Sequence, residues 1–239
     1  MIPMPTGFYR SFSEKTLTTP GAARRSRIEQ WRFSLLGRFA SPPGALLEIG
    51  PGRGTLAVLA RDAGWRYLAI EPSPVLATQL RSSGFDVVEA FVPPVPAADD
   101  SQDVIYADQV VEHMPGIDAA RHLVADAWRA LRPGGIFFVV VPDYLKEQAF
   151  FWDIDYTHNF ITTERRMQQL LYDGGFTVEL VVRSIGRATG IQRDLLAAGS
   201  LLVNIPGTDA LSRYTRTSEL LFRVRKNLFE TLTIVAKKA

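Results

Sequence analysis

Three closely spaced glycines and a later glutamate are the residues whose spacing first suggests chemistry. The segment 46–54 reads LLEIGPGRG and places Gly50, Gly52 and Gly54 directly after a short apolar run. Glycine lets a backbone take left-handed conformations and lets a ligand approach main-chain atoms without meeting a Cβ atom. Glu71 ends the next apolar run, 21 residues after Gly50, and its carboxylate can accept hydrogen bonds from both hydroxyls of a ribose. Together these features predict a nucleoside site; a plain strand-to-helix turn is the structural alternative.

Two further residues distinguish between the possible nucleotides. The dinucleotide fingerprint G-x-G-x-x-G needs a glycine at position 55, where this chain has Thr55. Glu48 precedes the bend and would lie close to the pyrophosphate of a dinucleotide, which it would repel. The same carboxylate favours the sulfonium and ammonium charges of S-adenosyl-L-methionine. The loop therefore favours this methyl donor over NAD.

The hydrophobic pattern around these residues predicts strands that alternate with helices. Apolar runs predict strands over 45–49, 67–70, 85–88, 103–107 and 136–141, with helices over 55–63, 74–83 and 117–131. Such alternation builds right-handed βαβ units and a parallel sheet, and ligands bind at the carboxyl ends of its strands. The run 136–141 is apolar on both faces, which predicts helices above and below it.

The flanking segments have a looser pattern. Ile28, Trp31, Leu35 and Phe39 recur at helical spacing and predict an amphipathic helix that lies against the body of the domain. After residue 142 we expect an aromatic loop, then a helix over 163–172 and strands over 178–182 and 228–235, with a helical lid or side element between those two strands.

Several segments, taken in order, resemble motifs of the class I S-adenosyl-L-methionine-dependent methyltransferases, specifically the small-molecule group whose first motif is E-x-G-x-G-x-G. They are LEIGPGRG at 47–54, AIEP at 69–72, DVIYADQVVEH at 103–113, LRPGG at 131–135 with VP at 141–142, and DGGF at 173–176. The resemblance implies a doubly wound α/β fold with a mostly parallel, seven-stranded, Rossmann-like sheet, an antiparallel C-terminal strand and a helical lid. We expect a single domain over 1–239, with an arm (1–43), a cofactor-binding core (44–183), the lid (184–227) and the final strand (228–239).

The resemblance also assigns donor-binding roles. It implies that Gly50 and Gly52 lie against the methionine and ribose portions of S-adenosyl-L-methionine, with Gly54 as the third glycine of the loop. It implies that Glu48 holds the amino end directly or through water, and that Glu71 takes the ribose hydroxyls.

Two more donor contacts come from the ends of later strands. Ala107 and Asp108, at the end of the fourth predicted strand, are expected to border the methionyl end of the donor. Many relatives place an aspartate shortly after the third strand to accept from the adenine amino group, whereas this chain has EAFV at 89–92. We therefore expect adenine to stack on Phe91 or to contact Glu89.

The acceptor side points to a histidine. Methyl transfer from a sulfonium is an in-line displacement that positioning can largely accelerate, although a base helps when the acceptor is a weakly acidic hydroxyl. His158 lies beyond the fifth predicted strand, where an acceptor would arrive, in a D-x-T-H arrangement that resembles a segment of glycan and small-metabolite methyltransferases. We expect His158 to act as general base or acceptor ligand, with hydrogen bonds that order the loop as the alternative. Asp155 either orients His158 or has a solvated or helix-entry role. His113 is expected to pack beneath the site and His122 to lie on a helix surface.

Other candidate features receive weaker roles. Asp155 and His158 lack a third metal ligand at a plausible spacing, so we expect no metal site. The aromatic residues Phe8, Tyr9, Phe151 and Trp152 either close over the substrates or seal exposed core, and the arginines in 24–27 begin a solvated helix.

Composition bounds the function classes. The chain has 239 residues, is 46% hydrophobic and has a net charge of +2 without a long basic run, so nucleic acid is not an expected partner. It contains no cysteine, which excludes disulfides and thiolate catalysis.

We expect no signal peptide or membrane span and a cytoplasmic location, and the oligomeric state stays open. The expected function is methyl transfer from S-adenosyl-L-methionine to a small-molecule or glycan acceptor, at a hydroxyl of a metabolite or sugar. An N- or C-methyltransferase and a noncatalytic donor-binding subunit are the alternatives.

Overall fold

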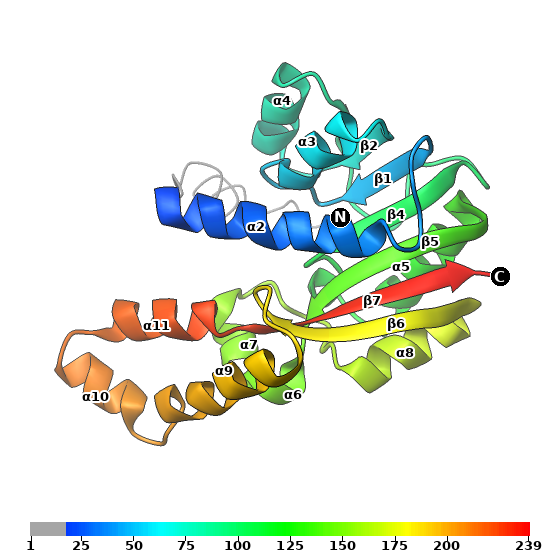
Figure 1. Cartoon of the computed structure of the whole chain (residues 1–239). Helices are drawn as coiled ribbons and strands as arrows, with labels where there is room; N and C mark the ends of the chain where they lie inside the picture. Colours follow the sequence, from blue (N-terminus) through cyan, green and yellow to red (C-terminus); the bar gives the residue numbers. More distant parts are fainter. Residues whose placement is uncertain (1–17) are drawn as a thin grey trace.

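The computed structural model describes residues 18–239, and its core is one seven-stranded sheet (Figure 1). The strand order across the sheet is β3 (Asp86–Val88), β2 (Arg66–Ile70), β1 (Ala45–Ile49), β4 (Gln102–Asp108), β5 (Leu131–Pro142), β7 (Glu230–Lys238), β6 (Phe176–Ile185). Strands β1 to β5 are parallel, and β7 is antiparallel to both β5 and β6. The predicted α/β fold with an antiparallel C-terminal strand is confirmed. Phe8 and Tyr9 lie outside the described residues.

The helices between the parallel strands begin and end within two residues of the predicted limits. They are α3 (Thr55–Asp62), α4 (Pro74–Ser82) and α5 (Ile117–Ala130). Helix α4 has the predicted N-cap, because Leu76 N donates to Ser73 Oγ at 3.5 Å and Pro74 occupies its first turn. Gly64 follows α3 at a φ of 92°, a conformation that suits glycine at a helix end.

The core has two layers that meet on β5. Phe137, Val139 and Val141 belong to one cluster, with buried residues of α5 and of α8 (Glu164–Asp173). The alternate residues Ile136 and Phe138 belong to the other cluster, with residues of α3 and of α2 (Thr19–Leu36). Burial of β5 on both faces confirms the interpretation of its apolar run.

Helix α2 confirms the predicted helix in the arm, and Leu35 is buried as expected, but its buried face also carries two charged residues. Its buried residues are Glu29, Arg32, Leu35 and Leu36, whereas Ile28 and Trp31 are only half-buried. The buried face is therefore rotated toward two charged residues, which can be buried only because they have partners in the domain.

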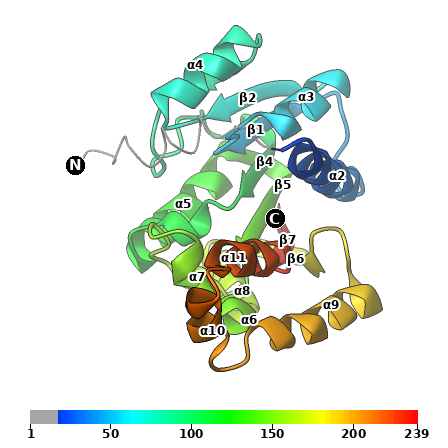
Figure 2. The same cartoon turned by 90° about the vertical axis from the view of Figure 1, so that its left-hand side faces the viewer.

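The segment after β5 is more helical than expected. Residues predicted as an aromatic loop form α6 (Tyr144–Glu147) and α7 (Ala149–Ile154) before a loop that contains His158. The predicted helical lid consists of α9 (Gly190–Val203), α10 (Thr208–Tyr214) and α11 (Ser218–Asn227). Figures 1 and 2 show these three helices grouped beyond the end of the sheet at which β7 begins. Among residues 18–239, no helix combines the length and hydropathy that crossing a bilayer requires.

Candidate active site

The glycine bend joins β1 to α3 at the carboxyl edge of the sheet. Gly50, Gly52 and Gly54 have φ values of 71°, 55° and 71°, a region where a Cβ causes strain. A Cβ at Gly54 would lie 2.5 Å from Leu80 Cδ2, so helix packing also requires this glycine. A Cβ at Gly52 would meet no atom of the described chain within 4 Å. The backbone at Gly52 is therefore open to a ligand.

Glu71, directly after β2, lies against this bend. Its Oε2 accepts a hydrogen bond from Gly52 N at 3.2 Å, and its Oε1 accepts one from Ser73 N at 2.9 Å. The residue is 4% exposed, and this burial raises its pKa even though the two amides act in the opposite direction. Each carboxylate oxygen keeps a lone pair for a ligand hydroxyl. The structure thus brings together the two features from which the sequence predicts a nucleoside site.

Glu48 is buried beneath the bend. Its Oε2 accepts a hydrogen bond from Tyr67 OH at 2.5 Å. Loss of hydration raises the pKa of Glu48 to about 8. The side chain is therefore largely protonated near neutral pH, and a cation bound beside it would favour its ionised form.

A buried ion pair that was not expected from the sequence connects α2 to the end of β4. Arg32 Nη1 donates to Asp108 Oδ2 at 2.6 Å and to Glu29 Oε1 at 3.2 Å. Tyr106 OH donates to Glu29 Oε2 at 3.3 Å. Asp108, which is predicted to contact the methyl donor, is therefore held in place by α2 of the N-terminal arm. The available signal was the helical spacing of Glu29, Arg32 and Leu36, which places two charged residues on one face with an apolar one.

The other residues that are predicted to contact the methyl donor differ in how exposed their side chains are. Ala107 is fully buried between neighbouring strands, so a ligand at this edge would meet Asp108 first. Phe91 is 48% exposed and open to stacking. Glu89 lies 3.6 Å from Arg81 in an exposed ion pair.

His158 lies beside His113, with ring centroids 4.9 Å apart. His158 is buried and its Nδ1 is 2.7 Å from the carbonyl oxygen of Phe151. His113 Nδ1 is 2.8 Å from Thr157 Oγ1, which donates to Asp155 Oδ1 at 2.7 Å. Asp155 is thus linked through Thr157 to His113. The side chain of Asp155 was expected to orient His158 instead. Trp152 is 43% exposed and Phe151 is fully buried, so these two aromatic residues do not share one role.

Glu112 completes this group, which we call the Glu-His-His cluster (Glu112, His113 and His158). Its carbonyl oxygen accepts hydrogen bonds from Asn159 N and Phe160 N at 2.8 and 2.9 Å, and these tie the loop with His158 to the turn η1 (Val111–His113). Burial raises the pKa of Glu112 well above its ordinary value. Burial lowers the pKa of both histidines, that of His113 to about 4, so both imidazoles are neutral near pH 7.

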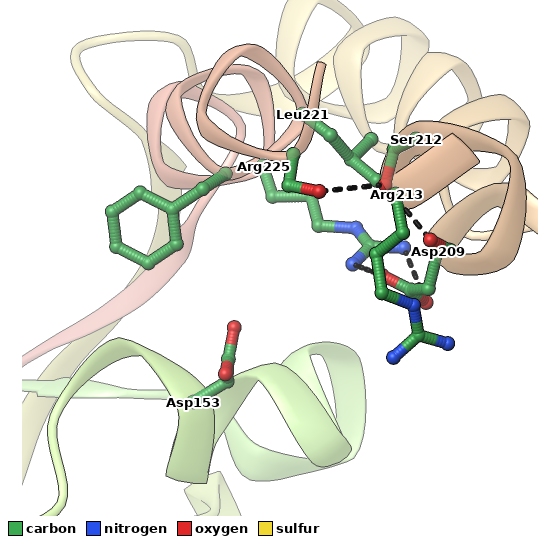
Figure 3. A pocket seen from close by; sticks show the side chains of 8 residues that line it. Asp153, Asp209, Ser212, Arg213, Leu221 and Arg225 are labelled. Atoms are coloured by element: carbon green, nitrogen blue, oxygen red, sulfur yellow. Dashed lines mark hydrogen bonds and ion pairs between the residues drawn. The ribbon is translucent and has the colours of Figure 1, made fainter. Parts of the chain in front are cut away.

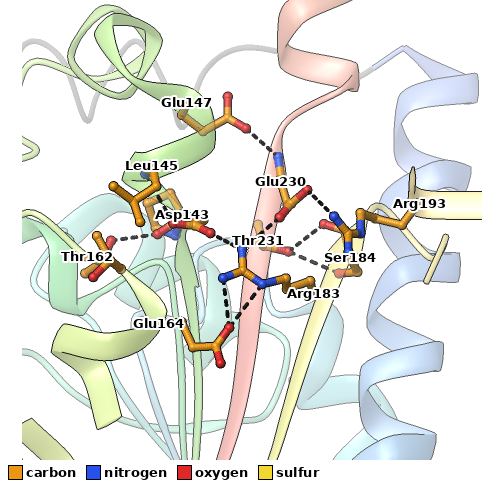
Figure 4. A network of polar contacts seen from close by, with 12 residues as sticks. Asp143, Leu145, Glu147, Thr162, Glu164, Arg183, Ser184, Arg193, Glu230 and Thr231 are labelled. Atoms are coloured by element: carbon orange, nitrogen blue, oxygen red, sulfur yellow. Dashed lines mark hydrogen bonds and ion pairs between the residues drawn. The ribbon is translucent and has the colours of Figure 1, made fainter. Parts of the chain in front are cut away.

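Arg183 on β6 lies at the centre of a network of ion pairs (Figure 4). Its guanidinium pairs with the fully buried Asp143, with Glu164 at 2.8 Å and with Glu230 at 3.2 Å. These three carboxylates follow β5, begin α8 and begin β7. The network therefore fixes both ends of the segment 143–164 that carries His158.

A separate cavity of about 200 Å³ lies between α7 and the lid (Figure 3). Its lining comes from α7, α10 and α11 and includes Asp153, Ser212 and Arg225. Arg225 is already held by Asp209, with Nη1 2.6 Å from Oδ1. The glycine bend contributes nothing to this lining, so the cavity is distinct from the predicted donor site.

Comparison with known proteins decides the family. A family model described as a methyltransferase domain matches residues 22–181 of this chain. The chain belongs to the class I S-adenosylmethionine-dependent methyltransferase family. It is 30% identical over 244 residues to a malonyl-[acyl-carrier protein] O-methyltransferase of Methylococcus capsulatus, a match that covers 91% of this chain and 87% of that protein. It is 31% identical over 143 residues to an uncharacterised methyltransferase of Mycobacterium leprae, covering 56% of this chain and 47% of that protein. The chain thus spans about half the length of that mycobacterial relative.

Solved structures support the fold of this methyltransferase. A geranyl diphosphate C-methyltransferase of Streptomyces coelicolor aligns with a TM-score of 0.63 at 16% identity, covering 90% of this chain and 79% of that one. A phosphoethanolamine N-methyltransferase of Haemonchus contortus aligns with a TM-score of 0.63 at 15% identity, covering 96% of this chain and 60% of that one. Both were solved with S-adenosylhomocysteine bound.

The residues at the carboxyl edge fit the methyl donor that the family implies. Gly52 leaves an open approach beside Glu71. Asp108 Oδ1 and Gln109 Nε2 are buried and have no hydrogen-bond partner among residues 18–239. Asp108 Oδ1 can accept a hydrogen bond from the ammonium of a methionyl group, and Gln109 Nε2 can donate one to its carboxylate. Glu48, in the neighbouring strand, would add a second carboxyl group near the ammonium.

Proposed function

We propose that this methyltransferase transfers a methyl group from S-adenosyl-L-methionine to an oxygen of a small-molecule acceptor, a hydroxyl of a metabolite or sugar. The observation that carries the proposal is the contact between Gly52 N and Glu71 Oε2. It supports the proposal because the carboxylate that we expect to bind the ribose lies against an open stretch of backbone, at the edge of the sheet where ligands of open α/β folds bind.

The donor would lie along this edge, from Phe91 and Glu71 at its adenosine half to Glu48 and Asp108 at its methionyl half. When bound, S-adenosyl-L-methionine supplies a methyl group that is already activated by the sulfonium. The chain's own contribution is to bind and orient: Glu71 fixes the ribose, and the carboxyl groups of Glu48 and Asp108 favour the positive end. Fixed geometry of this kind can supply most of the rate of a displacement reaction.

The acceptor would approach from the side of the loop 155–163. His158, as general base or acceptor ligand, would help to remove the proton of a hydroxyl, which ionises poorly at neutral pH. Because His158 is buried, the acceptor would reach it from the side of the half-buried His113 or after the loop has opened. The relative that matches over 91% of this chain is an O-methyltransferase by name, which supports oxygen as the acceptor atom over nitrogen or carbon.

The test is a screen of alcohols, sugars, phenols, carboxylic acids and amines with isotopically labelled donor, preceded by calorimetric titration with S-adenosylhomocysteine and with NAD. We expect binding of S-adenosylhomocysteine and transfer to a hydroxyl. Tight binding of NAD without any response to S-adenosylhomocysteine would refute the donor assignment. Donor binding with transfer to nitrogen alone would refute the acceptor assignment, and donor binding without any transfer would favour a noncatalytic subunit.

A further inference from the structure

The Glu-His-His cluster has a geometry that the donor site does not explain. One nitrogen of each imidazole and one oxygen of Glu112 lie within 4.8 Å of one another. Glu112 is 0% exposed and His158 is 4% exposed, while His113 is half-buried. These three side chains therefore converge on one point in the interior, with access from the side of His113.

The hydrogen bonds fix which nitrogen each imidazole offers. His158 Nδ1 lies 2.7 Å from a backbone carbonyl, and because a carbonyl only accepts, Nδ1 must carry the hydrogen. Thr157 gives its single hydroxyl hydrogen to Asp155, so its oxygen must accept from His113 Nδ1. Both imidazoles consequently carry hydrogen on Nδ1 and have a lone pair on Nε2.

Glu112 is the feature that demands a partner. Neither of its carboxylate oxygens has a hydrogen-bond partner within the described part of the chain, and both are buried. A buried carboxyl group without a partner stays neutral unless a cation pairs with its ionised form. The two neighbouring groups offer lone pairs and not hydrogens, so they do not satisfy the carboxylate. A cation placed between the three would satisfy all of them.

We propose that Glu112, His113 and His158 bind one divalent transition-metal ion. Two imidazoles and one carboxylate are the ligand set that Zn²⁺, Fe²⁺ and Mn²⁺ use in proteins, and three protein ligands leave coordination positions open. The outer contacts fit as well, because metal-bound histidines usually donate their other ring hydrogen to a carbonyl or, here through Thr157, toward a carboxylate. From the sequence we expected no metal site, because Asp155 and His158 have no third ligand at a plausible spacing. In the proposed site, His113 and Glu112 join His158 as ligands.

The position of the cluster suggests what the ion does. Glu112 and His113 follow β4 by a few residues, and Asp108 lies at the end of that strand. This role rests on the proposed function: the ion would coordinate the acceptor oxygen and lower the pKa of its hydroxyl, whose proton would pass to water while the oxygen takes the methyl group from the sulfonium. His158 would then serve as a ligand of the ion and not as a free base.

The direct test is a titration of untagged, chelator-treated protein with Co²⁺, in the absence of methyl donor and acceptor. We expect one Co²⁺ per chain, with the visible absorption of a low-coordinate nitrogen and oxygen site, and competition by Zn²⁺. Glu112→Gln and His158→Ala should weaken binding at least a hundredfold. Thr157→Val, which removes an outer contact, should weaken it about tenfold to a hundredfold. His122→Ala is the matched control, because this exposed histidine lies on α5 outside the cluster, and it should bind Co²⁺ as the unmodified protein does.

Thermal unfolding gives a second measurement that does not depend on spectra. Without metal, Glu112→Gln should melt at the same temperature as the unmodified protein or higher, because it removes an unpaired buried carboxylate. Zn²⁺ should raise the melting temperature of the unmodified protein and leave that of Glu112→Gln unchanged.

Absence of stoichiometric Co²⁺ binding, or equal binding by Glu112→Gln, would overturn the inference. These results are separable from the methyl-transfer assay. A metal-free enzyme that still methylates a hydroxyl at full rate would refute the metal role alone, and a metal-binding chain without transfer would refute the proposed function alone.

Discussion

Substitution of Gly52 by alanine separates donor binding from folding. Gly52 has a φ of 55° and a new Cβ would have no described atom within 4 Å. The substitution therefore costs only the backbone strain of a left-handed alanine, about 1 kcal/mol. For a chain of this size, that corresponds to a fall in melting temperature of about 2–4 °C.

The effect on donor affinity should be larger than this strain. A donor that packs on the Gly52 backbone lies at van der Waals distance, about 3.5–4.0 Å, and the added methyl group would occupy that space. We expect the affinity for S-adenosylhomocysteine to fall at least tenfold, about 1.4 kcal/mol. Isothermal titration calorimetry measures this directly, without knowledge of the acceptor.

Gly64→Ala is the matched control. Gly64 also has a positive φ, of 92°, and open space around a new Cβ within the described chain, but it lies at the opposite end of α3 from the bend. It should lose similar stability and keep full donor affinity. If both variants bind S-adenosylhomocysteine equally well, the donor does not pack on Gly52 and our placement of the site is refuted.

Three further predictions concern Glu48, Arg183 and His158. Burial raises the pKa of Glu48 to about 8, and a cationic ligand binds the ionised form of this side chain better. The affinity for the methyl donor should therefore rise between about pH 6 and pH 8 and level off above. Calorimetry across this pH range should give a flat affinity profile for Glu48→Gln. Arg183→Met leaves the buried carboxylate of Asp143 without its cation and leaves Glu230 with only Arg193, at 3.5 Å; it should cost about 3 kcal/mol of unfolding free energy in urea titrations. His158→Ala should lower turnover at least about a hundredfold while calorimetry finds donor affinity within about threefold.

Each of these has an outcome that contradicts it. A persistent rise of affinity with pH in Glu48→Gln would assign the titration to another group. Arg223→Ala removes an exposed ion pair with Glu219 and should be nearly neutral; a loss as large as that of Arg183→Met would contradict the importance of burial. Unchanged turnover in His158→Ala would remove this residue from the reaction.

The parts of the fold that local sequence determines were predictable. Ser73 and Pro74 mark the start of α4, the glycines mark the bend, and the continuous apolar run 136–141 indicates a strand with two covered faces. Glu71 also belongs to this class, because its distance from the bend along the chain is set by one βαβ unit.

The parts that depend on distant contacts were not predictable. Arg32 and Asp108 are 76 positions apart, and no local pattern in either segment specifies the other. The same holds for Glu112, whose carbonyl fixes the loop with His158 through hydrogen bonds that form only in the folded domain. Burial of a charged side chain is decided by its partner, and the partner is a property of the tertiary structure.

The position of β7 has a consequence for synthesis. Strand β6 leaves the ribosome before β7, yet its neighbour in the sheet is β7, which inserts between β6 and β5. Until residues 230–238 emerge, the nascent chain must therefore carry two unpaired strand edges, and such edges readily pair with other chains. Loss of those residues would therefore leave a gap between β5 and β6 near one edge of the sheet, and the two exposed strand edges would be prone to aggregate.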